Sequence, residues 1–330
     1  MATILFLLVT VQTGDHYLLQ REAVSGPGPE VQLRVAVVKP VFTATAYASF
    51  YYFYGKYAGT PKGQFVTSDV GLLDHVVVNS WGWSDGLRQF LASKDAIAHG
   101  LIRGRTLTVL TDVSVTEGGL YDQYGSRKFD VVILGFTEYV TSKQYHAYKH
   151  FVATGGRLIL LDATNFLAEV KYHPGNQHIS LVKGHSWGFD GKKAWRDVID
   201  RWRDENTNWV ASTFFYSGQR QYAGALVSRI HTIGWKLWHE FGPRVFTSYS
   251  AHEENIVTNM TGTVILANWV TSNPDRFNTT LSQNIVAAYL HHYLKGLVIH
   301  IGVMGSDVVL RDRSVQSFLV NAIFEPDRLR

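Results

Sequence analysis

The stretch FDVVILGFTEYVTSKQYHAYKHFVATGGRLILLDATN, residues 129–165, decides the fold class of this chain. Its apolar, β-branched beginning, residues 129–136, is typical of a buried strand. Thr141 or Ser142 then caps a helix with apolar positions at helical spacing, which ends at Gly155-Gly156. The remaining residues predict another strand. Strand, helix and strand at this spacing form a βαβ unit, which predicts a parallel sheet with right-handed crossovers.

Other segments extend this α/β pattern. Further strands are predicted at 33–42, 106–111, 262–270 and 298–305, and further helices at 43–55, 279–296 and 312–324. In the helix predicted at 279–296, one residue of the pair His291-His292 is expected to face the core and the other the surface. We therefore expect a mostly parallel sheet flanked by helices.

The chain is expected to contain one domain. Residues 1–33 read as an N-terminal segment and a linker, because they contain a Gly-Pro-Gly-Pro run. Residues 34–330 are expected to form a single α/β domain. Within it, residues 167–245 are rich in tryptophan and glycine and hold only short candidate strands, so we interpret them as an aromatic-rich inserted lobe.

Composition excludes several classes of function. Apolar residues make up 46% of the 330 residues and charged residues only 18%, which predicts a folded globule. The net charge of +4 gives nucleic acid binding little electrostatic support. Cysteine is absent, which removes cysteine nucleophiles and thiolate metal sites. No GxGxxG, GKS or GxSxG motif occurs, so nucleotide-binding and serine-hydrolase interpretations are disfavoured.

The sequence leaves the location of the protein open between the cytoplasm and export. The apolar run at residues 4–11 is too short to span a bilayer, so no transmembrane segment is expected. The run is either a first strand or a degenerate export signal. Two glycosylation sequons, at Asn259 and Asn278, and the low charge favour an extracellular location weakly.

Polar residues follow several predicted strands at the point where each strand ends. In open parallel sheets, ligands bind beyond the carboxyl ends of the strands. The candidates for a pocket at this edge are Tyr47, Asp112, Glu138, Tyr139, Asp162 and Asn165. The alternative for Asp112 and Glu138 is that they stabilise nearby helix starts by charge and capping.

Two further clusters contain groups able to transfer protons. His252, Glu253 and Glu254 precede the strand predicted at 262–270, but Ile256 occupies the position of the second histidine of an HExxH motif. The alternative for these residues is a solvated turn. His185 lies among glycines and aromatic residues that line a pocket or form a loop wall.

Residues 130–166, together with the segment TATAYASFYYFYG at 43–55, resemble the large-subunit family of N,N-dimethylformamidase. The likeness runs loosely from residue 34 to about 170. It implies a class I glutamine-amidotransferase-like α/β fold and one iron ion, held by two tyrosines and a glutamate, that activates water to hydrolyse an amide. By position, Glu138 matches the glutamate and Tyr47 one of the tyrosines.

The sequence departs from the family pattern at two places. The family carries a histidine two residues before the glutamate, where this chain has Phe136. A second tyrosine ligand is not identified, and Tyr121 and Tyr124 are only near Glu138 in sequence. The amidotransferase nucleophile is excluded, since the chain has no cysteine.

These observations favour a metal-dependent amidohydrolase that acts on the C–N bond of a small amide. In this hypothesis Tyr47 and Glu138 hold one iron or zinc ion, and His252 or Glu254 handles protons. One alternative is a non-catalytic extracellular or cell-surface binding or structural protein that kept the fold without the metal. Another is a carbohydrate-binding or carbohydrate-active protein that uses exposed tryptophans with Asp and Glu partners. A homo-oligomer is compatible with each of these hypotheses.

Overall fold

The computed structural model describes ten segments of the chain, and all of them belong to one compact unit, residues 33–330. The described residues are 33–47, 67–69, 107–161, 165–183, 201–227, 245–246, 250–271, 286–301, 319–320 and 322–324. The apolar run at residues 4–11 and the Gly-Pro-rich linker lie outside them.

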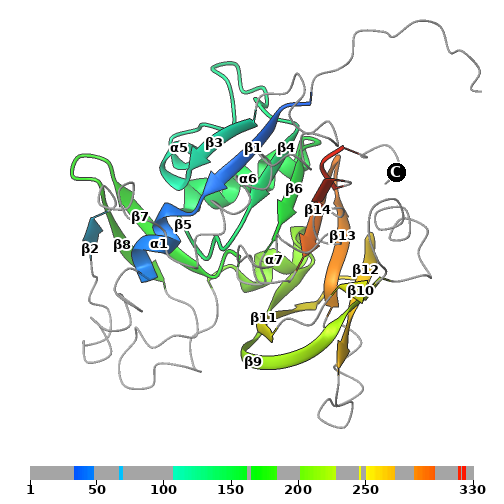
Figure 1. The fold of residues 1–330 in the computed structure, drawn as a ribbon. Coiled ribbons are helices and arrows are strands. Elements are labelled where there is room, and N and C mark those ends of the chain that lie inside the picture. The colour runs from blue at the N-terminus through cyan, green and yellow to red at the C-terminus, as the bar shows by residue number, and fades with distance from the viewer. Residues whose placement is uncertain are drawn as a thin grey trace, which may run out of the picture. The chain divides into compact units, whose positions relative to one another are not determined.

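Five neighbouring parallel strands form one half of a ten-stranded sheet (Figure 1). In sheet order they are β3 (Leu107–Thr111), β1 (Val35–Lys39), β4 (Val131–Leu134), β6 (Arg157–Leu160) and β14 (Gly296–Ile301). Strands β3, β1, β4 and β6 lie within segments where the sequence predicts a strand, and β14 overlaps the strand predicted at 298–305 but begins earlier, at Gly296. The α/β class expected from the sequence is therefore confirmed.

The other half of the large sheet is antiparallel, so the sheet as a whole is mixed. It continues from β14 through β13 (Val286–Tyr293), β12 (Thr263–Thr271), β9 (Ser212–Val227) and β10 (Val245–Phe246), while β11 (Ser250–Val257) pairs with β9. Strand β9 and the helix α7 (Arg203–Trp209) fall within the aromatic-rich range 167–245. Part of that range thus belongs to the main sheet.

The helix predicted at 279–296 is wrong, because residues 286–293 form β13, paired on both sides with β12 and β14. Residues 286–291 are all buried, which removes the alternation that marks a half-exposed strand. When every position of a short run is apolar, the apolar residues at helical spacing fit a helix as well as they fit a buried strand. His291 is nevertheless buried and His292 exposed, because neighbouring side chains of a strand point to opposite faces.

The predicted βαβ unit is confirmed by helix α6 (Ser142–Ala153) between β4 and β6. Thr141 caps the helix, since its Oγ1 accepts a hydrogen bond from the backbone N–H of Gln144 at 3.1 Å. The Gln144 side chain completes the capping box by accepting from the Thr141 N–H. Gly155, with φ of 105°, supplies the left-handed turn that ends the helix.

Two short helices follow the first two strands of the parallel half. Helix α1 (Val41–Tyr47) follows β1, and α5 (Asp112–Thr116) follows β3 with Thr111 as its N-cap. The helix predicted at 43–55 is confirmed as far as Tyr47, and its remainder lies outside the part of the chain that the structure describes. Within the helix predicted at 312–324, residues 319–320 and 322–324 are helical.

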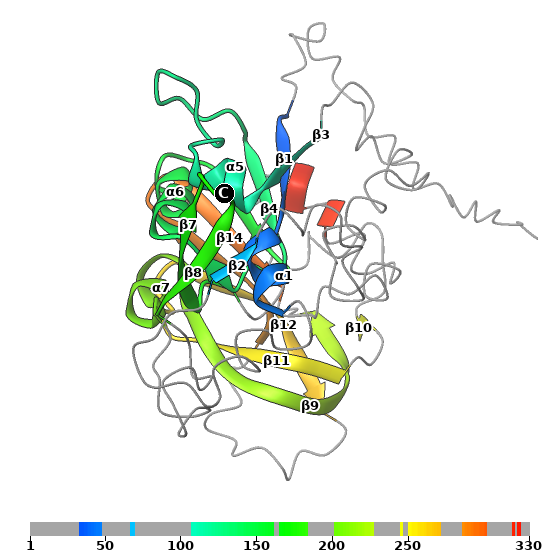
Figure 2. The ribbon, with the colours of Figure 1, turned by 90° about the vertical axis from the view of Figure 1, so that its left-hand side faces the viewer.

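A second, four-stranded sheet lies beside the first. Its strands, in order, are β2 (Thr67–Asp69), β8 (His178–Lys183), β7 (Ala168–His173) and β5 (Tyr139–Val140). Because β5 begins directly after Glu138, this small sheet starts at the carboxyl end of β4. Figure 2 shows β7 and β8 on the same side of the molecule as α6.

Hydrophobic cores cover both faces of the parallel strands. Side chains of each strand alternate between them, so that Val37 and Ile133 belong to one core and Val38 and Leu134 to the other. The first core is closed by Leu319, Val320, Ala322 and Ile323, and the second by α6 and α7 (Figure 2). Within the described segments, no helix is long and apolar enough to cross a membrane.

Candidate functional site

Polar side chains gather where the parallel strands end. Asp112 follows β3, Glu138 comes shortly after β4, Asn165 comes after β6, and His300 lies near the end of β14. All four are buried. Because parallel strands end at a common edge, the topology brings these residues to the place where open α/β sheets bind ligands.

Asp112 joins three helices at this edge. Its side chain is fully buried, and Oδ2 accepts a hydrogen bond from the backbone N–H of Phe42 at 2.9 Å, at the start of α1. Its Oδ1 accepts from the side-chain amide of Gln144 in α6. Burial raises the pKa of Asp112 to about 7, against the lowering effect of these two donors. Asp112 thus caps the start of α1, whereas its own helix α5 is capped by Thr111.

The backbone of Glu138 is held from both sides. Its N–H donates to Thr43 Oγ1 at 3.0 Å, and its carbonyl accepts from the N–H groups of Leu167 and Ala168 at 3.0 and 3.1 Å. The residue is fully buried. Since Thr141 caps α6, Glu138 does not open that helix. Its carboxyl group therefore lies inside the protein at the junction between β4 and β5.

The first expected tyrosine ligand lies on the helix that contacts the Glu138 segment. Tyr47 is the last residue of α1, one helical turn beyond Thr43, whose hydroxyl group binds Glu138. Helix α1 thus contacts the Glu138 segment through Thr43. The phenol of Tyr47 lies outside what the structure describes.

The neighbours of Glu138 in sequence are packed in the protein interior. Burial raises the pKa of Tyr139 well above its usual value, and the adjacent Glu138 raises it further, so this phenol stays protonated at neutral pH. Phe136, which stands where the family carries a histidine, belongs to the core between the sheet and residues 319–323. Its position is apolar.

A small pocket lies next to this segment, at the ends of β6 and β14. Five polar side chains and three apolar ones line it: Asn165, Asn206, Ser212, Thr213, His300, Leu160, Val210 and Phe214. Asn165 also accepts a hydrogen bond from the Thr137 N–H at 3.4 Å, which connects the pocket to the residue before Glu138. No lining side chain is Lys, Arg, Asp or Glu, and the pocket has room for about one water molecule.

Tyr289 of β13 supports the wall of this pocket. Its hydroxyl group donates to the Val210 carbonyl at 2.8 Å and lies 2.7 Å from Ser212 Oγ. Its ring stacks on His300, with centroids 5.0 Å apart. Burial raises the pKa of Tyr289 above its usual value. Tyr289, which lies on a strand outside the pocket, thus holds three lining residues in place: Val210, Ser212 and His300.

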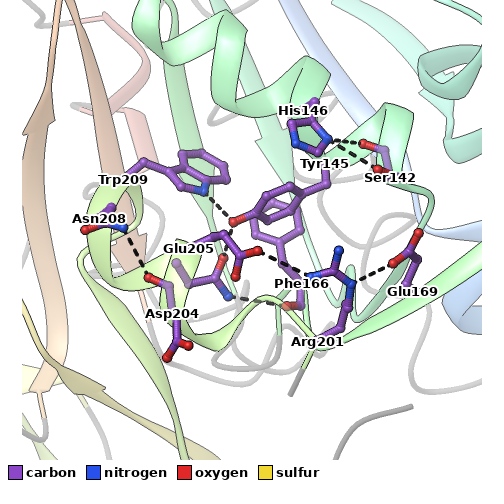
Figure 3. Close-up of polar contacts among 11 residues, drawn as sticks. Ser142, Tyr145, His146, Phe166, Glu169, Arg201, Asp204, Glu205, Asn208 and Trp209 are labelled. Atoms are coloured by element: carbon purple, nitrogen blue, oxygen red, sulfur yellow. Dashed lines mark hydrogen bonds and ion pairs between the residues drawn. The ribbon is translucent and has the colours of Figure 1, made fainter. Parts of the chain in front are cut away.

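An aromatic cluster on α6 and α7 contacts the lining residue Asn206, and Figure 3 shows its residues Tyr145 and Trp209. The Tyr145 hydroxyl group accepts from Trp209 Nε1 at 2.7 Å and donates to Asn206 Oδ1 at 3.1 Å. Trp202 stacks on Tyr145 at 3.9 Å between centroids, and the guanidinium of Arg201 lies over Trp202 at 4.0 Å. Both tryptophans are buried, so they are unavailable for stacking on a sugar.

Ion pairs fix the outer side of this cluster. Arg201 Nε lies 2.7 Å from Glu169 Oε2 on β7, and Arg201 Nη1 lies 3.3 Å from Glu205 Oε1 on α7. These contacts hold α7 against the small sheet. The cluster therefore acts as a packed wall that positions Asn206 at the pocket.

The other candidate residues are dispersed or lie outside the described part of the chain. Asp162 and His185 belong to the latter. His252 and Glu254 lie on β11, so the solvated turn considered for them is wrong, although their side chains are not described. Tyr121 donates its hydroxyl group to the Ala147 carbonyl at 3.0 Å.

Tyr124 is 83% exposed, in the loop that leads into β4. Among the described residues, three or more His, Asp or Glu side chains do not come together in a cluster able to hold a metal ion.

Thr43 and several pocket residues could not be identified from the sequence. Asn206, Ser212 and Thr213 come from α7 and β9, which join the site only through the fold. His300 alone carried a signal, since it stands near the end of a strand that the sequence predicts. The sequence does not place β14 beside β6, because it predicts a helix where β13, the other neighbour of β14, is found.

The fold and the site define an α/β protein with a buried polar site at the carboxyl ends of its parallel strands. Residues 17–235 match the family described as N,N-dimethylformamidase beta subunit-like, C-terminal. This match spans well over half of the chain. The protein belongs to that family.

Comparison with solved structures gives only distant likenesses. A catalytic mutant of a GH42 β-galactosidase from G. stearothermophilus has a TM-score of 0.45 at 9% identity, over 84% of this chain and 28% of that chain. A ThuA-like protein from Bacteroides uniformis has a TM-score of 0.45 at 11% identity, over 91% and 93% of the two chains. A cytoplasmic protein from Salmonella typhimurium has a TM-score of 0.40 at 8% identity, over 88% and 98%.

The chain thus spans less than a third of the β-galactosidase it matches. Structural similarity at these TM-scores does not indicate a function. No curated protein matches the chain.

Proposed function

We propose that this protein is a metal-dependent hydrolase of amide C–N bonds whose site surrounds Glu138. One observation carries the proposal. The chain is a member of the dimethylformamidase-like family, and its Glu138, shortly after β4, is fully buried. The backbone N–H of Glu138 donates a hydrogen bond to α1, the helix that ends in Tyr47. The two residues expected to hold the metal thus come from adjoining segments.

The types of donor present favour iron over zinc. Carboxylate and phenolate oxygens are hard ligands that suit ferric iron, whereas structural and catalytic zinc sites rely on histidine and cysteine. The chain has no cysteine, and its described residues contain no cluster of three His, Asp or Glu. Glu138 and Tyr47 would hold the ion, which when bound supplies a Lewis acid that polarises an amide carbonyl and lowers the pKa of water.

The pocket beside Glu138 would hold a water molecule next to the site. Asn165, Ser212, Thr213 and His300 offer neutral hydrogen-bond donors and acceptors, and Thr213 Oγ1 is buried there without a protein partner. Such groups suit a bound water molecule, the second reactant that the hydrolysis of an amide needs.

Strand pairing favours Glu254 over His252 as the residue that handles protons. Strand β11 runs beside the part of β9 that lines the pocket, with Ile256 opposite Thr213 and Asn255 opposite Phe214. Glu254 is the next residue along and pairs with Tyr216. His252 lies further from the pocket along the same strand.

Metal content and amide hydrolysis test the proposal together. Purified protein should contain close to one iron per chain and release dimethylamine from N,N-dimethylformamide. Glu138→Ala should lose both the iron and the activity, whereas Glu117→Ala, which alters an exposed carboxylate, should keep both. Iron retained by Glu138→Ala, or hydrolysis by metal-free protein, would exclude this assignment.

A second candidate function is a binding protein that kept the fold and lost the metal. Phe136 favours it, because a core phenylalanine occupies the position where the family carries a histidine. In that case the purified protein contains no iron, and Glu138→Ala binds small amides as well as the unaltered chain does. The two candidates are separated by the metal analysis alone.

A further inference from the structure

The hydroxyl group of Thr43 accepts hydrogen bonds from two successive backbone N–H groups. Thr43 lies in α1 and is 1% exposed, and its Oγ1 is 3.0 Å from Glu138 N and 3.1 Å from Tyr139 N. We propose that Thr43 is a positioning residue that fixes the orientation of Glu138 for metal binding. This inference rests on the proposed function and deepens it.

The need for this hydroxyl group follows from the backbone around Glu138. Strand β4 ends at Leu134 and β5 begins at Tyr139, so the residues between them cross from one sheet to the other. Buried N–H groups require an acceptor. The Thr43 hydroxyl group is the acceptor for the N–H groups of Glu138 and Tyr139, a role that a neighbouring strand has in a regular sheet.

The Glu138 peptide is immobilised because its opposite side is also bound. The carbonyl of Glu138 accepts from Leu167 and Ala168, the residues that lead into β7. The Thr137 carbonyl likewise accepts from Phe166 N at 2.9 Å. With Thr43 on the other side, the direction of the bond that carries the Glu138 side chain is set by the fold.

Helix α1 is itself anchored, so Thr43 cannot shift to follow Glu138. Asp112 accepts from Phe42 N, the residue before Thr43, and also from Gln144 in α6. Since α1 ends in Tyr47, the same helix positions both expected ligands. Thr43 therefore sets the spacing between the backbone of Tyr47 and that of Glu138.

Thr45 provides a matched control within the same helix. It is 2% exposed, and its Oγ1 donates to the Val41 carbonyl at 2.6 Å. Thr45→Val and Thr43→Val thus remove the same group from the same buried helix. Only the second variant removes the acceptor for the Glu138 and Tyr139 N–H groups.

The experiment compares Thr43→Val, Thr43→Ser and Thr45→Val in the full chain. Iron affinity is measured by titration with ferric citrate, and backbone hydrogen exchange of Glu138 and Tyr139 by NMR. Thr43→Val should lower iron affinity about 10- to 100-fold, as loss of a group that orients a ligand does, and should accelerate exchange at both amides. Thr43→Ser should restore both, and Thr45→Val should change neither.

Each outcome decides the question. If Thr43→Val keeps full iron affinity while Glu138→Ala loses it, this inference is wrong and the proposed function stands. If Thr43→Val and Thr45→Val weaken iron binding equally, the role of Thr43 is structural only. If the unaltered chain binds no iron, the proposed function fails and this inference fails with it. Should Thr43→Val not fold, Thr43→Ala and Thr45→Ala replace the valine pair.

Discussion

The buried carboxyl group of Asp112 shows how one residue can both stabilise the fold and make it sensitive to pH. Its two hydrogen bonds connect α1 to α6, while the loss of water around it raises its pKa to about 7. An aspartate in the unfolded chain has a pKa near 3.9. The folded protein therefore binds the Asp112 proton more tightly than the unfolded chain does.

This difference predicts that Asp112 makes the protein less stable as the pH rises. Between about pH 4 and pH 7 the unfolded chain has released the proton and the folded protein has not, so the free energy of unfolding falls by up to about 1.4 kcal/mol per pH unit. Above pH 7 the contribution is constant. Asp112→Asn should lose this part of the slope, measured by urea unfolding at pH 5, 6 and 8.

The control for this prediction is Asp204→Asn, which alters an exposed carboxylate at the start of α7. Its pH profile should follow that of the unaltered protein. If the curves for Asp112→Asn and the unaltered protein run parallel from pH 5 to 8, the titration of Asp112 is not what changes the stability.

The polar residues show how much of the site is visible in the sequence. Asp112, Glu138 and Asn165 could be selected because each follows a predicted strand. Their roles could not, since the Asp112 bond to Phe42 spans 70 positions of sequence and the Glu138 bond to Thr43 spans 95. Thr43 has no feature in the sequence that separates it from Thr45.

Among the elements, helix α6 is connected to α5 through its N-cap residue. Thr141 caps the helix, and its Oγ1 also lies 2.9 Å from Thr116 Oγ1 at the end of α5. Both contacts use the same hydroxyl group.

Thr141→Ala should therefore reduce the free energy of unfolding by about 1 to 2 kcal/mol, the upper part of the range for loss of an N-cap. Chemical unfolding followed by tryptophan fluorescence measures it. Ser142→Ala, at the next position, should cost a few tenths of a kcal/mol at most, as surface substitutions do. Equal effects of the two substitutions would show that the cap does not stabilise α6.

Strand β14 packs closely on the end of α6, which explains the glycine at its start. A Cβ on Gly296 would meet the carbonyl oxygens of Val152 and Gly156, both of which belong to the backbone. Backbone atoms move only at a cost in packing. Gly296→Ala should lower stability by about 1 to 3 kcal/mol or more, the range for overpacking.

Thermal melting of Gly296→Ala and Gly175→Ala provides the test. Gly175 lies in the turn between β7 and β8, where an added Cβ would meet no atom within 4 Å. Only Gly296→Ala should lower the melting temperature clearly. An unchanged melting temperature would mean that β14 and α6 can separate without loss of stability.

The elements that the sequence predicted correctly are those with strong local signals. The βαβ unit has an apolar strand, a helix cap at Thr141 or Ser142 and a Gly-Gly stop, and all three are confirmed, with Thr141 as the cap. Strand β13 was mistaken for a helix because it is buried on both faces and shows no alternation. Its identity depends on β12 and β14, which only the fold brings to its sides.

At the scale of the whole molecule, Arg157 connects the sheet to a helical segment far along the chain. Its side chain is 7% exposed, and Nη1 donates to the carbonyls of Ala322 and Ile323 at 2.7 Å each. Arg157→Met should lower the free energy of unfolding by about 2 to 3 kcal/mol, as loss of hydrogen bonds to a charged group does. Guanidinium unfolding measures the change.

Arg203→Met is the matching change on the surface, because Arg203 is exposed at the start of α7. It should leave the midpoint of unfolding within a few tenths of a kcal/mol of the unaltered value. If Arg157→Met is equally mild, residues 319–324 are held by their apolar contacts alone.

The pairing of β6 with β14 joins two stretches far apart in sequence, since Leu160 lies opposite His300. During synthesis on the ribosome, β6 emerges long before its partner, and its free edge has to wait for most of the remaining chain. A nascent chain halted before residue 296 exposes that edge to other nascent chains. Translation that stalls in this interval should therefore yield aggregates, while release after β14 allows folding.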